Sequence, residues 1–472
     1  MMWKTAYICC ATLIVGGCAV GNEYVAPEDS VAARWIEPMA GEASGDLPQR
    51  WWARFQDDVL NDHLERAALQ NLDIKTATAR IDEARALRGI ARSAFWPQVS
   101  LGASFTQFEQ SIDSPSGAGA LISAGISERD IDFYNASLDA SWEIDLFGST
   151  RRRVDEANAN LEGTIAEREA VRLTALAETA GAYFELRGSQ QRLAIIESNI
   201  AAQQRTLDLT RRKVDAGLGR KIDQLRAEAQ LDAIAAEVPA LRASIRASTY
   251  RLGVLTGQRP EDMVDEVAVS GTLPAAPRAI PVGIRADLLK RRPDIAAAER
   301  QLAAAAAATN IARTDFFPRL VLNASYGFEA ENADDIGSSN ARTTGLVPFV
   351  SWPVFQGGRL RANLESAEAR TQQAALQYEK SVLTALADAE SAITAYAEEL
   401  RSFERLDSAA EASREAASIA QQLYEKGLAD FLTVLDADQR RDQAEDQRTQ
   451  SHTRLMLNLV RVYKALGGGW DV

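Results

Sequence analysis

The sequence DIKTATARIDEARALRGIARSAFWPQVSLGAS, from Asp73 to Ser104, recurs without a gap as DIAAAERQLAAAAAATNIARTDFFPRLVLNAS, from Asp294 to Ser325. A second match at a shorter offset places Gly217-Leu218 on Gly427-Leu428. Self-similarity at such long spacing indicates a chain built from copies of one supersecondary unit. Duplication of a whole unit explains both matches. The paired positions include Asp73/Asp294, Ile74/Ile295, Ile90/Ile311, Arg92/Arg313, Phe95/Phe316 and Pro97/Pro318.

Each copy is expected to run helix, strand, loop, strand, very long helix, tight turn and long helix. The helices are predicted from seam residues, mostly apolar, that recur at steps of three and four, as in a coiled coil. The 66 residues from Arg151 to Ala216 contain no proline, so they predict one helix roughly 100 Å long at about 1.5 Å per residue. The seams of the first copy comprise Leu193, Ile196, Ile200, Gln203, Leu207, Thr210 and Val214, then Leu231, Ile234, Val238, Leu241, Ile245, Ser248, Leu252 and Leu255.

Between the helices, apolar and polar residues alternate, which gives a strand one apolar face. Every second residue is apolar from Val99 to Phe105 and from Leu320 to Phe328. Segments of about 10 alternating residues with aromatic residues near their ends are typical of transmembrane β-strands. Soluble hairpins packed on the coiled coil are the alternative. We predict strands at residues 97–109, 132–146, 318–328 and 343–355.

Four strands cannot span a bilayer alone, because open edges would leave backbone amides and carbonyls unpaired in hydrocarbon. Single-chain barrels begin at about 8 strands, whereas three copies of this chain would supply twelve. The sequence therefore predicts a mainly α fold with a β-barrel part. In a homotrimer the long helices of the two repeats would form an α-barrel, and four transmembrane strands per chain would complete a 12-stranded barrel.

Composition disfavours several classes of function. The 472-residue chain has a formal net charge of -14, which would repel nucleic acid. Two histidines, His63 and His452, and three cysteines are available for metal binding or nucleophilic catalysis. A hydrolase hidden in the repeat framework is therefore disfavoured. We expect no enzyme activity, no metal site, no cofactor and no nucleic-acid partner.

The N-terminal residues resemble a lipoprotein signal. The apolar run from Thr5 to Val15 is too short to cross a bilayer and has the length of a secretory signal core. Val15-Gly16-Gly17-Cys18 then resembles the lipobox of bacterial lipoproteins. We expect a signal peptide at residues 1–17 and a lipidated segment at residues 18–60, acylated at Cys18. Ala19 stands where an aspartate would retain a lipoprotein at the inner membrane, so it points to the outer one. An ordinary cleaved signal with a chance cysteine is the alternative.

Three motifs carry a family resemblance: LPAAP at residues 273–277, DLLKRRPDI at 287–295 and AERQL at 298–302. With YEKGLADFL at 424–432 they resemble the TolC-like outer membrane factors. More narrowly, the chain is similar to the NodT/OprM class of lipoproteins that serve resistance-nodulation-division (RND) efflux pumps. It departs from the family pattern at Gly283-Ile284-Arg285, where Gly-Leu-Pro is usual. It departs again at Asp436-Ala437-Asp438-Gln439, where Asp-Ala-Gln-Arg is usual, which alters the charge pattern near the periplasmic end.

The resemblance implies a trimeric exit duct that is lipid-anchored in the cell outer membrane and extends into the periplasm. Its periplasmic tip would dock to a membrane-fusion (adaptor) protein and, through it, to an inner-membrane RND-type pump. Drugs, metals or other small solutes would pass through passively. The expected domains are repeat 1 at residues 61–264, a linker at 265–285 and repeat 2 at 286–472. A periplasmic coiled-coil scaffold lipoprotein without a pore is the alternative.

Two glycine turns, Gly217-Leu218 and Gly427-Leu428, interrupt the long seams and reverse the chain. Glycine allows the left-handed conformation that a helix end requires. The resemblance implies that these tips face the adaptor. Asp223 and Asp430 follow the turns by a few residues, and we predict that both cap helix N-termini.

The resemblance also implies a periplasmic gate in the last helix. Asp436 would form an acidic ring that narrows the closed entrance, and Leu432, one turn nearer the tip, would add a hydrophobic constriction. Arg226 occupies the position of the first repeat that matches Asp436, so an interhelical salt bridge between these two residues is the alternative. The Arg291-Arg292-Pro293-Asp294 stretch is interpreted as a helix start, not as a reactive cluster.

Overall fold

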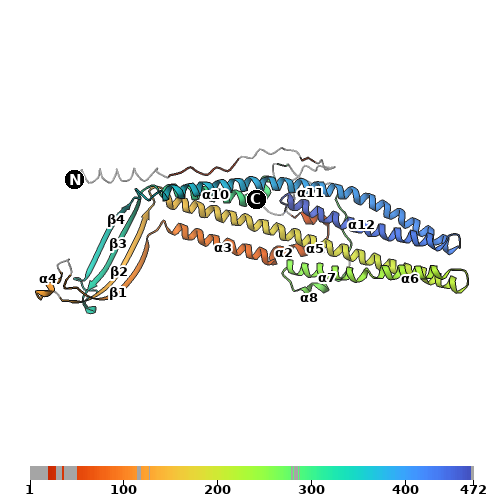
Figure 1. The fold of residues 1–472 in the computed structure, drawn as a ribbon, viewed down its shortest axis with the longest axis horizontal. Coiled ribbons are helices and arrows are strands. Elements are labelled where there is room, and N and C mark those ends of the chain that lie inside the picture. Colours follow the sequence, from red (N-terminus) through yellow and green to blue (C-terminus); the bar gives the residue numbers. More distant parts are fainter. Residues whose placement is uncertain are drawn as a thin grey trace. The chain divides into compact units, whose positions relative to one another are not determined.

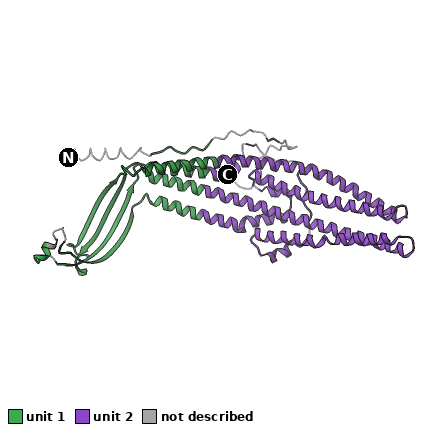
Figure 2. Ribbon diagram, in the orientation of Figure 1, with its two compact units in different colours: residues 1–27, 82–162, 299–376 green, residues 28–81, 163–298, 377–472 purple. Residues whose placement is uncertain are grey.

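The computed structural model describes residues 20–27, 35–36, 50–113, 118–126, 128–269, 271–277, 280, 285 and 288–468. The described chain is mostly helical with one antiparallel sheet (Figure 1), which agrees with the fold class expected from the sequence. It divides into two units, each assembled from segments of both repeats (Figure 2). Residues 1–17 and Cys18 lie outside the described residues. Unit 1 comprises residues 1–27, 82–162 and 299–376, and unit 2 comprises residues 28–81, 163–298 and 377–472.

Unit 1 contains a four-stranded antiparallel sheet in the order β1-β2-β3-β4. Each repeat contributes one hairpin, and every strand overlaps the range expected for it. A short helix, α4 (Ala118–Ser123), lies in the loop of the first hairpin, and a 3-10 turn, η3 (Ala333–Asp335), lies in that of the second. The strands are β1 (Gln98–Glu109), β2 (Asp130–Ile144), β3 (Arg319–Ala330) and β4 (Arg342–Ser351).

The register of the strands separates an apolar face of the sheet from a polar face. Leu101 pairs with Leu138, and Leu138 pairs in turn with Tyr326, so these side chains share one face. The apolar face is apolar except near the hairpin loops, where it carries Gln107, Glu109, Asp130, Asp132, Arg342 and Thr344. Its other members are Val99, Leu101, Ala103, Phe105, Tyr134, Ala136, Leu138, Ala140, Trp142, Ile144, Leu320, Leu322, Ala324, Tyr326, Phe328, Ala330, Leu346, Pro348 and Val350. The polar face comprises Gln98, Ser100, Gly102, Ser104, Thr106, Phe108, Ile131, Phe133, Asn135, Ser137, Asp139, Ser141, Glu143, Arg319, Val321, Asn323, Ser325, Gly327, Glu329, Thr343, Gly345, Val347, Phe349 and Ser351.

In each repeat a tryptophan in or directly after the second strand of the hairpin is hydrogen-bonded to the turn that joins the preceding helix to the first strand. The indole Nε1–H of Trp142 donates to the carbonyl oxygen of Phe95 at 3.0 Å. The indole of Trp352, which directly follows β4, donates to Phe316 at the same distance, 3.0 Å. Phe95 and Phe316 are matched positions of the repeat, so the same hydrogen bond is made twice.

Two helices of 67 residues, α5 (Ser149–Asp215) and α11 (Arg359–Glu425), are the longest elements of the chain. Their equal length is what duplication predicts. Each leads through a tight turn into a returning arm, formed by α6 (Lys221–Ala235) with α7 (Val238–Leu255) in repeat 1 and by α12 (Phe431–Ala465) in repeat 2. The other helices are η1 (Trp51–Phe55), α2 (Asp58–Gln70), α3 (Leu72–Ser93), α8 (Pro260–Glu266), α9 (Leu288–Arg291) and α10 (Pro293–Thr314).

The predicted helix start at Pro293 is confirmed. α10 begins at this residue, with Asp294 in its first turn. Proline is suited to that position because the first amides of a helix have no intrahelical partner. Arg292 donates to both carboxylate oxygens of Asp294, at 2.9 and 2.6 Å, which fixes the guanidinium beside the helix start.

A cluster of buried aromatic side chains forms part of the core of unit 2. Trp51 stacks on Tyr463 with ring centroids 5.0 Å apart, and Phe55 contacts Phe184 edge-on at 5.0 Å. Tyr183, beside Phe184, donates its hydroxyl to Asp57 at 2.6 Å. Burying a large apolar side chain contributes about 1.5–3 kcal/mol. Packing of this kind therefore attaches the short helix η1 to α5 and α12.

The seam from Leu231 to Leu255 does not form one helix, contrary to the expectation. α6 ends at Ala235 and α7 begins at Val238. Pro239 stands in the first turn of α7, and it lacks the N–H that a continuous helix would donate to the carbonyl of Ala235. The heptad spacing continues across the break because it depends only on the positions of apolar side chains. It therefore does not reveal a missing backbone donor such as that of Pro239.

We predict that the two indole hydrogen bonds stabilise the sheet equally. Trp142→Phe and Trp352→Phe should each lower the free energy of unfolding by about 0.5–1.5 kcal/mol, the net value of one hydrogen bond. The measurement is the urea midpoint of the purified protein. Trp96→Phe is the matched control, because Trp96 is 73% exposed. A control variant as unstable as the other two would contradict the assignment.

Candidate functional site

The two predicted turns have the same backbone geometry. Gly217 and Gly427 have φ angles of 74° and 76°, in the left-handed region that favours glycine. In the first turn the Leu218 amide donates to the carbonyl of Lys213 at 2.8 Å. In the second, the Leu428 amide donates to the carbonyl of Leu423, also at 2.8 Å. This six-to-one hydrogen bond is the mark of a Schellman helix end.

Each turn presents a leucine to solvent. Leu218 is 81% exposed and Leu428 is 72% exposed. Apolar side chains with this exposure contribute little to the stability of the chain that carries them. The matched pair is therefore available for contact with another molecule.

Tyr424 joins the second turn to the first repeat. The ammonium of Lys213 donates to the carbonyl oxygen of Tyr424 at 2.7 Å and lies 3.7 Å from the centroid of its ring. The hydroxyl groups of Tyr424 and Thr210 are 3.3 Å apart. The ring itself is buried in a cluster with Leu207, Ala227, Phe431 and Val434. Residues of both repeats thus hold the two turns of one chain together.

The two aspartates expected to cap the returning helices behave differently. Asp430 is the N-cap of α12, and its carboxylate accepts from the Thr433 amide at 2.9 Å, as predicted. The expectation for Asp223 is wrong. The N-cap of α6 is Arg220, which makes no capping hydrogen bond with its side chain. Asp223 is instead buried in the first turn, where its carboxylate accepts from Arg220 Nε at 3.2 Å.

Leu432 and Asp436, the expected gate residues, lie on the exposed side of α12. The side chain of Asp436 is 65% exposed and pairs with Arg440 of the same helix at 2.9 Å. Arg226 is 3.8 Å from Asp223. In the described part of the chain the alternative salt bridge between Asp436 and Arg226 is therefore not formed. An exposed pair at this spacing contributes little to stability, so the negative charge of Asp436 is held by only a weak local partner.

A buried acidic network on the other side of α12 was not expected. Asp438 is 7% exposed and pairs with Arg441 at 2.9 Å, while the same guanidinium donates to Asp442 at 2.8 Å. Burial raises the pKa of Asp438 and that of Asp442. Arg414 of α11 donates to Glu445 at 3.0 Å and so links α11 to the same helix. The one signal in the sequence is the aspartate at position 438, where the family resemblance leads us to expect glutamine.

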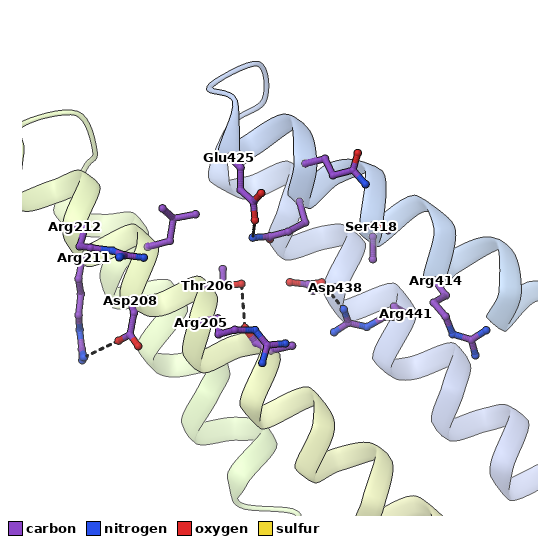
Figure 3. A pocket seen from close by; sticks show the side chains of 15 residues that line it. Arg205, Thr206, Asp208, Arg211, Arg212, Arg414, Ser418, Glu425, Asp438 and Arg441 are labelled. Carbon is purple, nitrogen blue, oxygen red and sulfur yellow. Dashed lines mark hydrogen bonds and ion pairs between the residues drawn. The ribbon is translucent and has the colours of Figure 1, made fainter.

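Asp438 and Arg441 line a groove of about 990 Å³ between α5, α11 and α12. Figure 3 shows these two residues facing each other on α12, with Arg414 beside them on α11 and Arg205 on α5. Most of the charged residues that line this groove are arginines. The groove is lined by Ala202, Arg205, Thr206, Asp208, Leu209, Arg211, Arg212, Arg414, Ala417, Ser418, Gln421, Gln422, Glu425, Asp438 and Arg441.

The two histidines lie away from the turns. His63 is fully buried, and burial lowers its pKa. His452 donates from Nε2 to the carbonyl of Pro274 at 3.0 Å, and its pKa is also lowered by burial. Among the described residues, no group of three or more His, Cys, Asp and Glu side chains could hold a metal ion. The helices described here include none that is both long enough and apolar enough to cross a membrane.

Comparison with known proteins identifies the family. The family model for outer membrane efflux proteins matches residues 63–258 and 284–468, which together are most of the chain. The chain belongs to the outer membrane efflux protein family. The two matched segments lie within the ranges 61–264 and 286–472 expected for the repeats, apart from two residues at 284–285.

Relatives in this family match over almost their full length. The pyoverdine export outer membrane protein OpmQ of Pseudomonas putida is 33% identical over 441 residues, which cover 93% of this chain and 92% of that one. Nodulation protein T of Rhizobium leguminosarum bv. trifolii is 30% identical over 430 residues, 90% of this chain and 89% of that one. The solved structure of the outer-membrane channel OprN has a TM-score of 0.88 at 37% identity and covers 96% of this chain and 100% of its own.

The raised pKa of Asp438 predicts a pH dependence with a defined sign. A folded-state pKa above the unfolded one means that the folded chain binds the extra proton first, so this residue stabilises the fold more as pH falls. At neutral pH the buried negative charge of Asp438 destabilises the folded state. Asp438→Asn should therefore gain more stability over the wild type at pH 7 than near pH 4.

Thermal unfolding at both pH values, followed by circular dichroism, measures this difference. Asp436→Asn removes the same charge from the exposed side of α12 and controls for the change in net charge. An advantage of the Asp438→Asn variant that is constant or grows as pH falls would show that the buried carboxylate does not titrate as described.

Proposed function

We propose that this protein is the outer membrane exit duct of a tripartite efflux or export system. It would pass drugs, metals or other small solutes passively from the periplasm to the exterior, without enzyme activity of its own. The observation that carries the proposal is the four-stranded sheet with one apolar face and two open edges, β1 and β4. Such a sheet is stable in a membrane only if its edges pair with those of other copies.

A homotrimer satisfies this requirement. Three sheets of four strands supply the twelve strands of a closed barrel, with the apolar faces toward lipid and the polar faces toward the lumen. In this trimer the long helices extend into the periplasm as an α-barrel. Family membership supports the proposal, because the solved relative OprN is an outer-membrane channel.

The exposed turns are proposed to contact a periplasmic membrane-fusion (adaptor) protein, and through it an inner-membrane RND-type pump. The support is the matched pair Leu218 and Leu428, apolar and exposed at the ends of both hairpins. Gly217 and Gly427 would give the two leucines the same orientation, because both glycines have a left-handed backbone conformation that other residues rarely adopt.

We further propose that Leu432 and Asp436 narrow the periplasmic entrance when the duct is closed. Three copies of the exposed Asp436 carboxylate around one axis would attract cations and repel one another. Its only partner of opposite charge among the described residues, Arg440, lies on the same helix, so no salt bridge to the first repeat holds this part of α12 in place.

Conductance in planar bilayers tests the duct and its gate together. The purified wild-type protein should migrate as a trimer before heating and conduct ions. Leu432→Ala with Asp436→Ala should raise the single-channel conductance, because both changes widen the entrance. Asp430, which caps the same helix, must be left intact so that the helix start is unchanged. A stable monomer without conductance would support the alternative of a coiled-coil scaffold, and an unchanged conductance in the double variant would refute the gate.

Lipidation of Cys18 is proposed on the sequence Val15-Gly16-Gly17-Cys18. The multiple acyl chains of a bacterial lipoprotein would anchor the N-terminus firmly, at about 0.8 kcal/mol for each buried methylene. Metabolic labelling with palmitate should label the wild type and leave Cys18→Ser unlabelled. Cys10→Ser is the control, because that cysteine lies inside the proposed signal peptide. Equal labelling of Cys18→Ser would show that acylation, if any, occurs elsewhere.

A further inference from the structure

We propose that a pocket in unit 2, at the end of α12 and the start of α10, binds an organic anion with an apolar body, whose negative charge Arg461 and Lys464 would hold. The pocket is formed by residues of one unit of one chain, so the inference goes beyond the proposed duct and does not depend on it. It places a ligand site at the opposite end of α12 from the proposed gate.

The pocket has the dimensions of a small-molecule site. Its volume is about 480 Å³, and residues of α5, α10, α11 and α12 line it. Ligand pockets in proteins are usually clefts of about 300–1,000 Å³. Pro293, which begins α10, and Ala465, which ends α12, both belong to the lining. The pocket therefore occupies the junction between a helix that begins and a helix that ends.

Much of the lining is apolar. Leu173 of α5, Ala392 of α11 and Ala465 contribute to it, and Leu173 and Ala465 are buried. The lining also includes the hydroxyl groups of Thr174 and Ser391. An apolar wall with a few polar groups binds the body of an organic molecule by burial and orients it by hydrogen bonds. A simple inorganic anion would leave this apolar surface unused.

The two carboxylates of the pocket already have a basic partner. Asp294 and Asp388 both pair with Arg292, at 2.6 and 3.4 Å. The same guanidinium donates to the carbonyl oxygen of Ala465 at 3.2 Å, and its side chain is only 11% exposed. Arg292 is thus fixed in the wall, and the carboxylates that hold it are not the partners of the other basic residues.

Those other basic residues, Arg461 and Lys464, have no partner of opposite charge in the part of the chain that the structure describes. Acidic residues outnumber basic ones in this protein, 66 to 52, so carboxylates are not scarce. The two residues are three positions apart on α12 and so are neighbours on its surface. Every other lysine or arginine of α12 pairs with a carboxylate: Arg440 with Asp436, Arg441 with Asp438, Arg448 with Asp407 and Arg454 with Glu399.

The position of Lys464 in a helix end explains only part of this arrangement. Lys464 lies in the last turn of α12, where a positive charge is favourable beside the free carbonyl groups. Arg461 lies outside that explanation, because it stands one turn earlier. The end of a helix also does not account for a pocket between four helices with two unpaired basic side chains in its lining.

The class of ligand follows from these groups. A guanidinium offers two parallel N–H donors that match the two oxygens of a carboxylate, and an ammonium adds a compact positive charge. The apolar wall formed by Leu173 and the alanines would receive rings or a short hydrocarbon chain. An aromatic or aliphatic carboxylate combines both features.

Equilibrium dialysis of the full-length protein in a neutral detergent tests the site, with 1-naphthoate as the probe and protein-free detergent dialysed in parallel. The wild type should bind 1-naphthoate saturably, with one site per chain, and binding should weaken as KCl is added because salt screens the charges. The neutral analogue 1-naphthamide should bind at least several-fold more weakly. Absence of saturable binding, or equal binding of the amide, would overturn the inference.

Two variants locate the binding in this pocket by different means. Arg461→Gln with Lys464→Gln should weaken binding roughly tenfold or more, as expected for the loss of charge-assisted hydrogen bonds. Ala395→Leu keeps both charges and fills the pocket from an exposed position of α11, and it should also abolish binding. Saturable binding that survives both changes would place the site elsewhere and refute the proposal.

Two matched controls exclude a general effect of charge or folding. Arg461→Lys with Lys464→Arg exchanges the two basic groups and should keep the affinity within a few-fold of the wild type. Arg454→Gln removes a basic residue of the same helix that is paired with Glu399 outside the pocket, and it should bind as the wild type does. If Arg454→Gln weakens binding as much as the double glutamine variant, the effect is one of net charge and the site is not the one proposed.

Discussion

Backbone hydrogen bonding at the two edges of the sheet is the constraint on which the rest depends. β1 and β4 are the outer strands of the sheet, and each has a row of N–H and C=O groups without a partner in that sheet. In water these groups bind solvent, but in hydrocarbon each one left unpaired costs several kcal/mol. The apolar face of the sheet favours hydrocarbon, so the edges must find partners there. In the proposed trimer, other copies of the same chain provide these partners, and a closed lumen follows from that pairing.

Much of the fold could be predicted because its signals are local and repeated. Period-two alternation after Pro97 and after Pro318 predicts β1 and β3, and the proline-free stretch from Arg151 predicts α5, one of the two helices of 67 residues. Pro293 identified a helix start, since its ring and missing N–H fit the first position of a helix. The duplication strengthened each of these signals. The hydrogen bonds of Trp142 and Trp352 to matched carbonyls could not be read from the sequence, because they depend on where each strand returns in space.

The candidate site was predictable only in part. The turns at Gly217 and Gly427 require glycine for a local reason and could be found. The sequence offers Arg226 of the first repeat as a partner for Asp436. The structure pairs Asp436 with Arg440 instead, because residues four positions apart are neighbours on the surface of a helix. The burial of Asp438 follows from the same geometry, because two residues along a helix correspond to about 200° of rotation and so to the opposite side. The network that Asp438 forms with Arg441 depends on tertiary packing, which the sequence alone does not reveal.

The two hairpin tips share a backbone and differ in their stabilisation. α12 begins with a carboxylate cap from Asp430, whereas the side chain of Arg220 makes no capping hydrogen bond to α6. Lys213 of the first hairpin donates to the carbonyl of Tyr424 in the last turn of α11, which also accepts from the Gly427 amide at 3.1 Å. A positive charge is favourable at this end of a helix, so the first repeat adds a charged contact to the helix end of the second. A displacement of the second hairpin must either break this contact or move the first hairpin with it, so opening the proposed entrance involves both repeats of each chain.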